Sequence, residues 1–176
     1  MIQFTHFNYC PRCSSASIAV HMKNAIACSA CGYVYFHNSA AAVAGIIEID
    51  GSILLLKRAH EPRIGCLDLP GGFVDYGESL DAALVREVRE ECNLPIVDIR
   101  YFGSFPNTYH YREVTYFTAD AVFLCRPADG AAERLALSEE NSGYVLVKPG
   151  DVDIAMVAFD SARAAIKKYS ELFPGI

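Results

Sequence analysis

The sequence has no long apolar run, no basic N-terminal segment and no excess of basic charge. The stretch from Ser39 to Ile47 is far shorter than the ~18 apolar residues that span a bilayer, so we expect no membrane partner. The first ten residues lack a basic run followed by an apolar one, so we expect no signal peptide and a cytoplasmic location. With 15 Lys and Arg against 21 Asp and Glu, the net charge of −6 argues against a sequence-independent grip on nucleic acid. We therefore expect no DNA partner.

Apolar residues are abundant, at 52% of a chain of 176 residues. This composition excludes intrinsic disorder and is ample for one hydrophobic core, so no disulfide framework is required for stability. The length predicts one domain, or one domain with a small appendage. The negative net charge does not exclude an anionic substrate, provided that a metal ion lies between the protein and the substrate.

Four of the seven cysteines form two Cys-x-x-Cys pairs, Cys10 with Cys13 and Cys28 with Cys31. Each pair presents two thiolates to one ion, and two pairs complete the tetrahedral shell of a structural Zn²⁺. A redox pair is expected singly, and a disulfide framework would not leave three odd thiols. The pattern therefore predicts a zinc ribbon over residues 1–38, in which the metal stabilises a segment too small to build its own core.

The rest of the chain mixes strand and helix signals. Apolar runs at 42–48 and 52–57 flank Asp50-Gly51, a dipeptide that favours a tight hairpin turn. Further strands are expected at 96–105, 115–125 and 144–147. Helices are expected at 80–92, between the N-cap Ser79 and Asn93, and at 161–172. Mixed strands with two helices predict an α/β sandwich.

The first predicted helix carries an acidic face beside its apolar face. At ~100° per residue, Glu87, Glu90 and Glu91 share one arc of the helix. Clustered carboxylates are the ligands that Mg²⁺ and Mn²⁺ prefer. The alternative is a solvated face on which Arg86 and Glu90 form an ordinary i,i+4 ion pair.

The wider string around this helix distinguishes the two interpretations. Gly72 is followed by five residues, Glu78 and seven more residues, and residues 86–94 then read Arg-Glu-Val-Arg-Glu-Glu-Cys-Asn-Leu. The string resembles the Nudix box, G-x5-E-x7-R-E-U-x-E-E-x-G-U, in which U is apolar. Asn93 replaces the final Gly and is the residue best able to do so at a left-handed helix end. The resemblance runs from about Ala40 onward and implies a Nudix α/β/α sandwich with a mixed sheet over residues 39–176.

Similarity to the Nudix family implies a hydrolase that cleaves the pyrophosphate bond of a nucleoside diphosphate linked to another group. It also implies Mg²⁺ or Mn²⁺ as cofactor. The metal ligands that the resemblance implies are Glu87, Glu90, Glu91, Gly72 through its carbonyl, and Glu78, which would also support the loop.

Two catalytic roles follow from the same resemblance. Arg86 would orient the glutamates of the box. The general base stays open between Glu91 and Glu90 within the box and the later Glu140, with Glu139 as an adjacent alternative. In each case the base would activate a water that attacks phosphorus in line.

The substrate is less closely specified. A four-cysteine ribbon joined to a Nudix box resembles the NADH pyrophosphatase branch, which carries Ser-Gln-Pro-Trp after the box. Residues 104–107 here read Ser-Phe-Pro-Asn, and the chain contains no Trp. NADH-like and ADP-ribose-like dinucleotides therefore both remain open. The alternatives are a nucleoside triphosphate pyrophosphatase and a non-catalytic nucleotide-sensing or RNA-binding module.

Four residues are candidates for substrate binding. Tyr109 and Tyr111 would stack on a base, although an amphipathic strand also explains them. Arg58 and Arg63 would reach phosphates, although solvated charges explain them equally well. Similar proteins are commonly dimers, so a homodimer is a further expectation.

Overall fold

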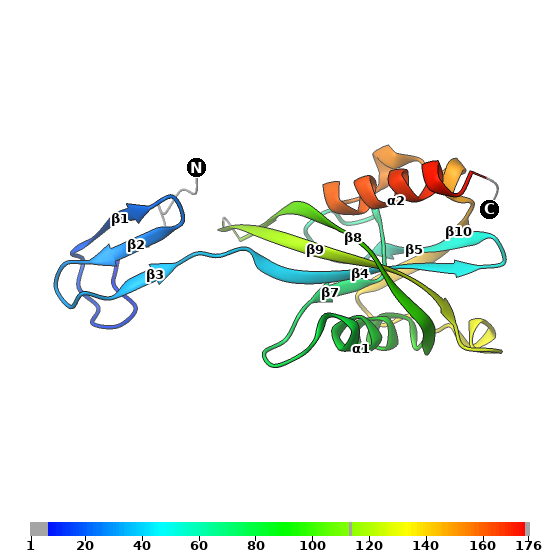
Figure 1. The fold of residues 1–176 in the computed structure, drawn as a ribbon, viewed down its shortest axis with the longest axis horizontal. Helices are drawn as coiled ribbons and strands as arrows, with labels where there is room; N and C mark the ends of the chain where they lie inside the picture. Colours follow the sequence, from blue (N-terminus) through cyan, green and yellow to red (C-terminus); the bar gives the residue numbers. More distant parts are fainter. Residues whose placement is uncertain (1–6, 113, 175–176) are drawn as a thin grey trace.

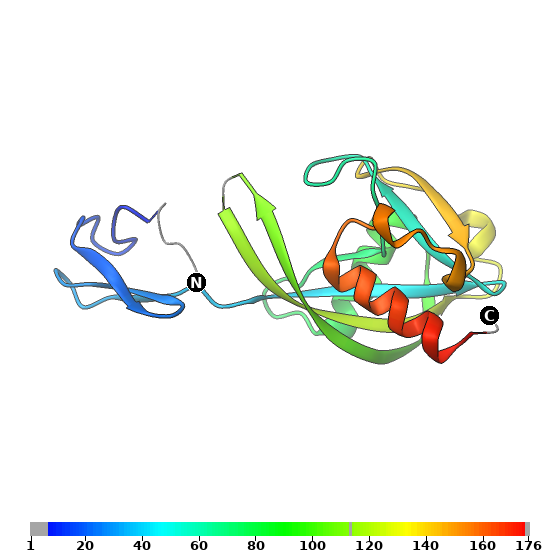
Figure 2. The same ribbon diagram turned by 90° about the horizontal axis from the view of Figure 1, so that it is seen from above.

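The computed structural model describes residues 7–112 and 114–174, which form two separate sheets (Figure 1). The smaller sheet is antiparallel and lies at one end of the molecule; its strands are β1 (Ile18–Met22), β2 (Ala25–Cys28) and β3 (Val34–Phe36). The tips of β8 (Ile96–Tyr111) and β9 (Val114–Pro127) point towards it (Figures 1 and 2). His37 Nε2 lies 3.4 Å from the Thr115 carbonyl oxygen, and its ring packs on Tyr116 with centroids 6.2 Å apart.

The larger sheet has seven strands in the order β10-β5-β4-β9-β8, with β6 paired to β5 and β7 paired to β4. Its remaining strands are β4 (Ala40–Ile49), β5 (Ser52–Arg58), β6 (Leu67–Asp68), β7 (Gly71–Phe73) and β10 (Asn141–Val147). Strands β4 and β9 are parallel, from Ala40 opposite Thr118 to Ile47 opposite Cys125, and the other pairs are antiparallel. Short 3₁₀ helices occur at Ala132–Arg134, Pro149–Asp151 and Ile154–Met156.

Two helices cover opposite faces of this sheet, α1 (Leu80–Cys92) and α2 (Asp160–Leu172) (Figure 1). Strand β5, which lies between β10 and β4, directs Leu54 and Leu56 into the core beneath α1, and Ile53 and Leu55 into the core beneath α2. Coverage of both faces explains why this strand is continuously apolar. The predicted α/β/α sandwich with a mixed sheet is confirmed.

Local sequence signals account for the elements nearest the box. Asp50 and Gly51 have φ values of 49° and 74°, the left-handed pair of a two-residue hairpin. Helix α1 has the predicted bounds: the Ser79 hydroxyl accepts from the Ala82 N–H at 3.4 Å, and Asn93 is left-handed at φ 51°, ψ 34°. The Asn93 backbone N–H donates to the Arg89 carbonyl at 2.9 Å, and this bond ends the helix.

The structure differs from the sequence prediction mainly in strand length. Strand β8 continues to Tyr111 instead of ending at 105, and it pairs with β9 up to Tyr111 opposite Val114. Pro106 lies within it because β8 is an edge strand, where a missing N–H can face away from the ladder. Strand β10 begins three residues before the predicted start, and the short strands β6 and β7 have no predicted counterpart.

Parts of the predicted domains fall outside the description. Residues 1–6 of the predicted ribbon, and residues 113 and 175–176 of the predicted Nudix domain, lie outside the described residues. No helix of the described part combines the length and apolarity needed to cross a bilayer.

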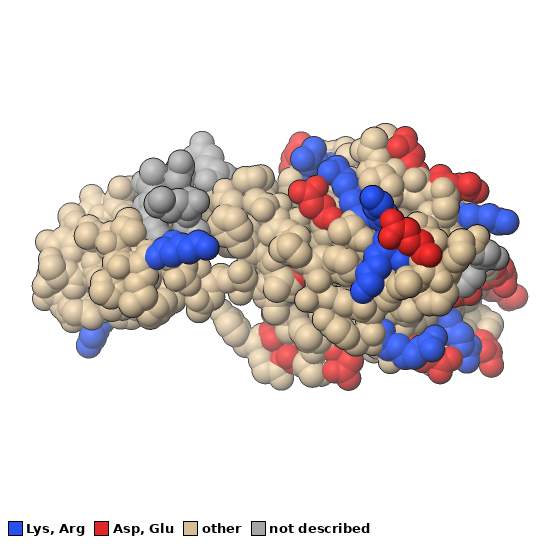
Figure 3. All heavy atoms as spheres, turned by 45° about the horizontal axis from the view of Figure 1, so that its top comes forward, with Lys and Arg blue, Asp and Glu red and all other residues tan. Residues whose placement is uncertain are grey.

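The chain has no acidic residue before Glu48, and on the face in Figure 3 the region of the small sheet shows basic but no acidic side chains. The acidic charge therefore belongs to the sandwich.

Asn93 offers a direct test of why α1 ends where it does. Asn93→Gly is expected to keep the free energy of unfolding within about 0.5 kcal/mol of wild type, because Gly adopts left-handed backbone without strain. Asn93→Val is expected to lower it by about 1–2 kcal/mol, because a Cβ-branched residue is strained there. Urea unfolding followed by circular dichroism measures both, and equal losses in the two variants would contradict the assignment.

Candidate functional site

A cleft of about 410 Å³ lies where the start of α2 meets β4, β7, β9 and the acidic face of α1. Three glutamates of α1 line it, Glu87, Glu90 and Glu91, together with Gly72. The structure therefore brings together four of the five residues that the sequence analysis suggests as metal ligands.

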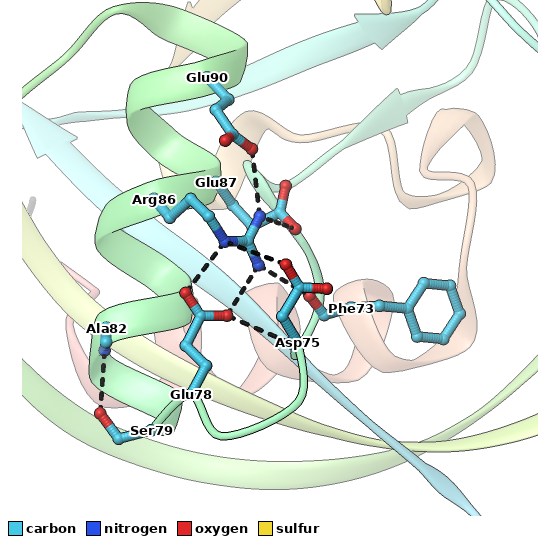
Figure 4. A network of polar contacts seen from close by, with 8 residues as sticks. All are labelled: Phe73, Asp75, Glu78, Ser79, Ala82, Arg86, Glu87 and Glu90. Carbon is cyan, nitrogen blue, oxygen red and sulfur yellow. Dashed lines mark hydrogen bonds and ion pairs between the residues drawn. The ribbon is translucent and has the colours of Figure 1, made fainter.

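The fifth, Glu78, is not among the lining residues and belongs to a network centred on Arg86 (Figure 4). The Arg86 guanidinium donates to both Glu78 oxygens at 2.9 Å, to Glu87 at 2.8 Å and to Glu90 at 3.1 Å. It also donates to the Phe73 carbonyl at 3.0 Å. One side chain thus joins α1 to the loop after β7, and the charged fork matches the carboxylate geometry.

Two glycines allow the carboxylates of α1 to approach the backbone. A Cβ on Gly72 would lie 2.5 Å from the Glu87 carboxyl carbon, so only Gly leaves room for this carboxylate. The Gly71 N–H donates to Glu91 at 2.8 Å, and the Asn141 side-chain amide donates to the other Glu91 oxygen at 3.3 Å. Gly71 has φ 151°, and a Cβ there would collide with the Val43 carbonyl.

Burial sets the proton affinity of these acids. Burial raises the pKa of Glu91 to about 8, against the opposing effect of the Gly71 and Asn141 hydrogen bonds. Burial also raises the pKa of Glu87, which Arg86 opposes and the charges of Glu90 and Glu140 reinforce. Several carboxylates with hard oxygen donors in one partly buried cleft are the donor set that fits Mg²⁺ or Mn²⁺.

The other predicted residues divide between the cleft and its surroundings. Arg58, Tyr109 and Glu140 line the cleft, and the Glu140 carboxylate is close enough to Glu87 to affect its pKa. The alternative Glu139 and the predicted substrate residues Arg63 and Tyr111 are not among the lining residues.

The same cleft has an aromatic wall formed by Phe73, Tyr109 and Phe159, of which only Tyr109 was predicted from the sequence. The ring of Tyr109 lies 5.7 Å from that of Phe73 and 5.6 Å from that of Phe159. The Arg58 guanidinium stacks over Phe159 at 5.0 Å and donates to Asp68 at 3.4 Å. Burial raises the pKa of Asp68 to about 7 in spite of this pairing. Phe73 and Phe159 lie far apart in the sequence, so no local pattern joins them.

Three polar residues on the floor of the cleft were also not predicted from the sequence. Thr118, Asp120 and Ser161 line the cleft, and each is buried. A charged residue on the buried face of β9, two positions before Val122, was the sequence signal that could have identified Asp120.

The four cysteines of the predicted ribbon converge at a second place. The Sγ atoms of Cys10 and Cys31 are 3.7 Å apart, those of Cys13 and Cys28 are 3.8 Å apart, and all four lie within 4.8 Å of one another. Tetrahedral Zn–S bonds of ~2.3 Å would separate sulfurs by roughly 3.8 Å, so the cluster fits zinc. Among the described residues, no other group of three or more His, Cys, Asp or Glu side chains approaches so closely.

Comparison with known proteins agrees with the fold and the box. A solved Nudix hydrolase from Nitrosomonas europaea superposes with a TM-score of 0.72 at 22% identity, covering 93% of this chain and 90% of that one. The family model described as NUDIX domain matches residues 36–169. The chain belongs to the Nudix family.

Two curated relatives are similar over part of their length. The ADP-ribose pyrophosphatase of Methanocaldococcus jannaschii is 54% identical over 61 residues, 35% of this chain and 36% of that protein. The NAD-capped RNA hydrolase NudC of Vibrio atlanticus is 30% identical over 123 residues, 68% of this chain and 45% of that protein. The chain thus matches less than half the length of each relative.

The Arg86 network predicts a specific loss of stability. Arg86→Met is expected to lower the free energy of unfolding by about 1.5–3 kcal/mol, because Glu78 and Glu87 lose a charged donor in a partly buried site. The matched control is Arg89→Met, an exposed arginine of the same helix, which is expected to change stability by less than about 0.5 kcal/mol. Urea unfolding measures both, and a loss of equal size in the two variants would contradict a structural role for the network.

Proposed function

We propose that the protein is a divalent-metal-dependent hydrolase that cleaves the pyrophosphate bond of a nucleoside diphosphate linked to another group. The observation that carries this proposal is the convergence of Glu87, Glu90 and Glu91 with Gly72 in one cleft. The same cleft also offers Arg58 and aromatic rings, which suit phosphates and a base or nicotinamide.

The four cleft residues of the box would hold the Mg²⁺ or Mn²⁺: Glu87, Glu90, Glu91 and Gly72 through its carbonyl. When bound there, the cation supplies Lewis-acid stabilisation of charge on the pyrophosphate and lowers the pKa of water. Glu78 has both oxygens taken by Arg86, so we assign it the role of holding the loop.

The chain's own groups then position the substrate and take up a proton. Arg58 would meet a phosphate oxygen, because its guanidinium is fixed by Asp68 and Phe159 at the edge of the cleft. The carboxylate of Glu91 is engaged by Gly71 and Asn141. Within the described part of the chain no side chain bonds to the Glu140 carboxylate, which makes it our candidate general base.

The names of two relatives support a dinucleotide-like substrate. ADP-ribose and an NAD cap share an adenosine diphosphate whose pyrophosphate leads to a second ribose. The cleft provides both carboxylates and an aromatic wall, which suits a pyrophosphate flanked by ring systems. Among NADH-like and ADP-ribose-like compounds, a product assay with Mg²⁺ or Mn²⁺ identifies the substrate: two monophosphates support the proposal, and release of pyrophosphate from nucleoside triphosphates contradicts it.

We further propose that the four-cysteine cluster holds one structural Zn²⁺. Four thiolates close the coordination shell, which leaves no position for a catalytic water. The metal would stabilise the three-stranded sheet, whose strands have few buried side chains of their own.

A charge-neutral substitution tests the metal-site carboxylates. Glu90→Gln is expected to reduce turnover by roughly 100-fold or more, a larger loss than that of an outer-shell partner, because a direct oxygen ligand loses its charge. The fold should persist, because the Glu90 side chain is 60% exposed. Glu139→Gln, an exposed neighbour of Glu140 outside the cleft, is the control and should retain wild-type turnover. Undiminished hydrolysis by Glu90→Gln would contradict the proposed mechanism.

Metal analysis tests the cysteine cluster. Elemental analysis of the purified protein is expected to find one Zn²⁺ per chain, and Cys28→Ser is expected to lose it, because three thiolates no longer close the shell. Cys66→Ser, which lies outside the cluster, should keep the metal. Zinc content that is unchanged in Cys28→Ser would contradict the assignment.

A further inference from the structure

Two polar side chains on the floor of the cleft each have one oxygen that is unpaired among the described residues. Thr118 and Asp120 lie two residues apart on β9, so both face the same side of the sheet, and both line the cleft. They are 5% and 8% exposed. Within the described residues, Thr118 Oγ1 and Asp120 Oδ1 have no hydrogen-bond partner. Buried oxygens without a partner are rare in proteins, so each requires an explanation.

The position of Asp120 is fixed by its second oxygen. The Ser161 hydroxyl, in the first turn of α2, donates to Asp120 Oδ2 at 2.5 Å. This bond restrains the carboxylate, and Oδ1 is left as a hydrogen-bond acceptor without a donor among the described residues. Thr118 can supply a donor or an acceptor, because a hydroxyl does both.

The neighbouring groups do not provide that donor. Arg58, a basic residue that lines the cleft, directs its hydrogen bonds to the Pro62 carbonyl at 2.8 Å and to Asp68, and stacks on the face of Phe159, so it does not donate to Asp120. Asp120 lies close enough for its charge to help raise the pKa of Asp68, so the groups next to Asp120 are acidic and favour an N–H donor over a phosphate at this point. The floor therefore suits a neutral part of a ligand that bears N–H groups.

The aromatic wall indicates what kind of group this is. Tyr109 and Phe159 line the same cleft as Asp120, and flat heteroaromatic rings stack on such side chains. A ring edge with an N–H₂ group beside an acceptor matches an acceptor on Asp120 and a donor on Thr118. The amino edge of adenine and the carboxamide of nicotinamide both have this pattern.

We propose that Asp120, Thr118 and Ser161 form a ring-recognition subsite that binds the N–H₂ group of an amino-substituted base or of a carboxamide. The ligand class rests on the proposed function, because the ring would belong to the dinucleotide whose pyrophosphate lies at the glutamates. Asp120 accepts from the N–H₂ group, Thr118 donates to the adjacent ring nitrogen or carbonyl, and Ser161 is a positioning residue that holds Asp120.

Binding of mononucleotides tests the subsite without requiring turnover. Two matched pairs are titrated by calorimetry in the presence of Mg²⁺: AMP against IMP, and nicotinamide mononucleotide against nicotinic acid mononucleotide. In each pair the second compound replaces the N–H₂ group by oxygen. Wild type is expected to bind the N–H₂ member of at least one pair about tenfold or more tightly, the size of a hydrogen bond to a charged acceptor. The pair that shows the preference identifies the ring.

Substitutions at the floor decide whether these residues cause the preference. Asp120→Asn is expected to abolish or invert it, because the amide presents a donor where the carboxylate presents an acceptor. Thr118→Val, which removes the hydroxyl but keeps the shape, is expected to reduce it. The control is Asp98→Asn, an exposed aspartate at the far end of β8, which should keep the wild-type ratio. Thermal unfolding confirms that each variant is folded; if Asp120→Asn is not, Thr118→Val and Ser161→Ala decide.

The outcomes separate this inference from the proposed function. A wild-type preference that disappears in the floor variants supports the subsite, even if no pyrophosphate substrate is hydrolysed. Equal binding within both pairs by wild type would overturn it, as would a preference that survives in every folded floor variant. In those cases the two oxygens serve the fold through ordered water, and hydrolysis assays still judge the proposed function on their own.

Discussion

The hydrogen bonds of the Arg86 guanidinium are the interactions on which the arrangement of the Nudix box depends. Carboxylates three and four residues apart on a helix repel one another, and burial strengthens the repulsion. Arg86 offsets it with N–H groups directed at three glutamates, and it ties the same helix to the backbone carbonyl of Phe73. A lysine would supply one point charge and could not serve these acceptors at once. The arrangement keeps an anionic surface ordered on the side where a cation would add its own charge.

The cleft has two walls with opposite chemistry. The wall on α1 is acidic and is built from one continuous stretch of sequence, with the glycines of β7 allowing close approach of backbone and carboxylate. The other wall combines aromatic rings with buried polar oxygens and is assembled from β8, β9, the start of α2 and Phe73 at the end of β7. Under the proposed function, the acidic wall would serve the reaction and the second wall would select the ligand.

Much of the fold was predictable because its signals are local. Ser79 and Asn93 mark both ends of α1 through their own capping geometry, and Asp50-Gly51 sets its hairpin. The full length of β8 was not predictable, because Pro106 reads as a strand break unless the strand is known to lie at the edge. The acidic side of the site was visible as a spaced motif. Phe73, Asp120 and Phe159 were not, because only the tertiary fold makes them neighbours.

The parallel pairing of β4 with β9 has a consequence for how the chain reaches this state. Residues 40–47 find their partners at 118–125, so the centre of the large sheet closes only after a long stretch of chain is available. Pairings between distant segments carry a large loop-closure entropy and form slowly. Helix α1 and its capping residues lie between these two segments in the sequence, so the acidic motif can become helical before the sheet exists. A fragment that ends before β9 would therefore contain every residue of the box and still lack the sheet centre against which α1 packs.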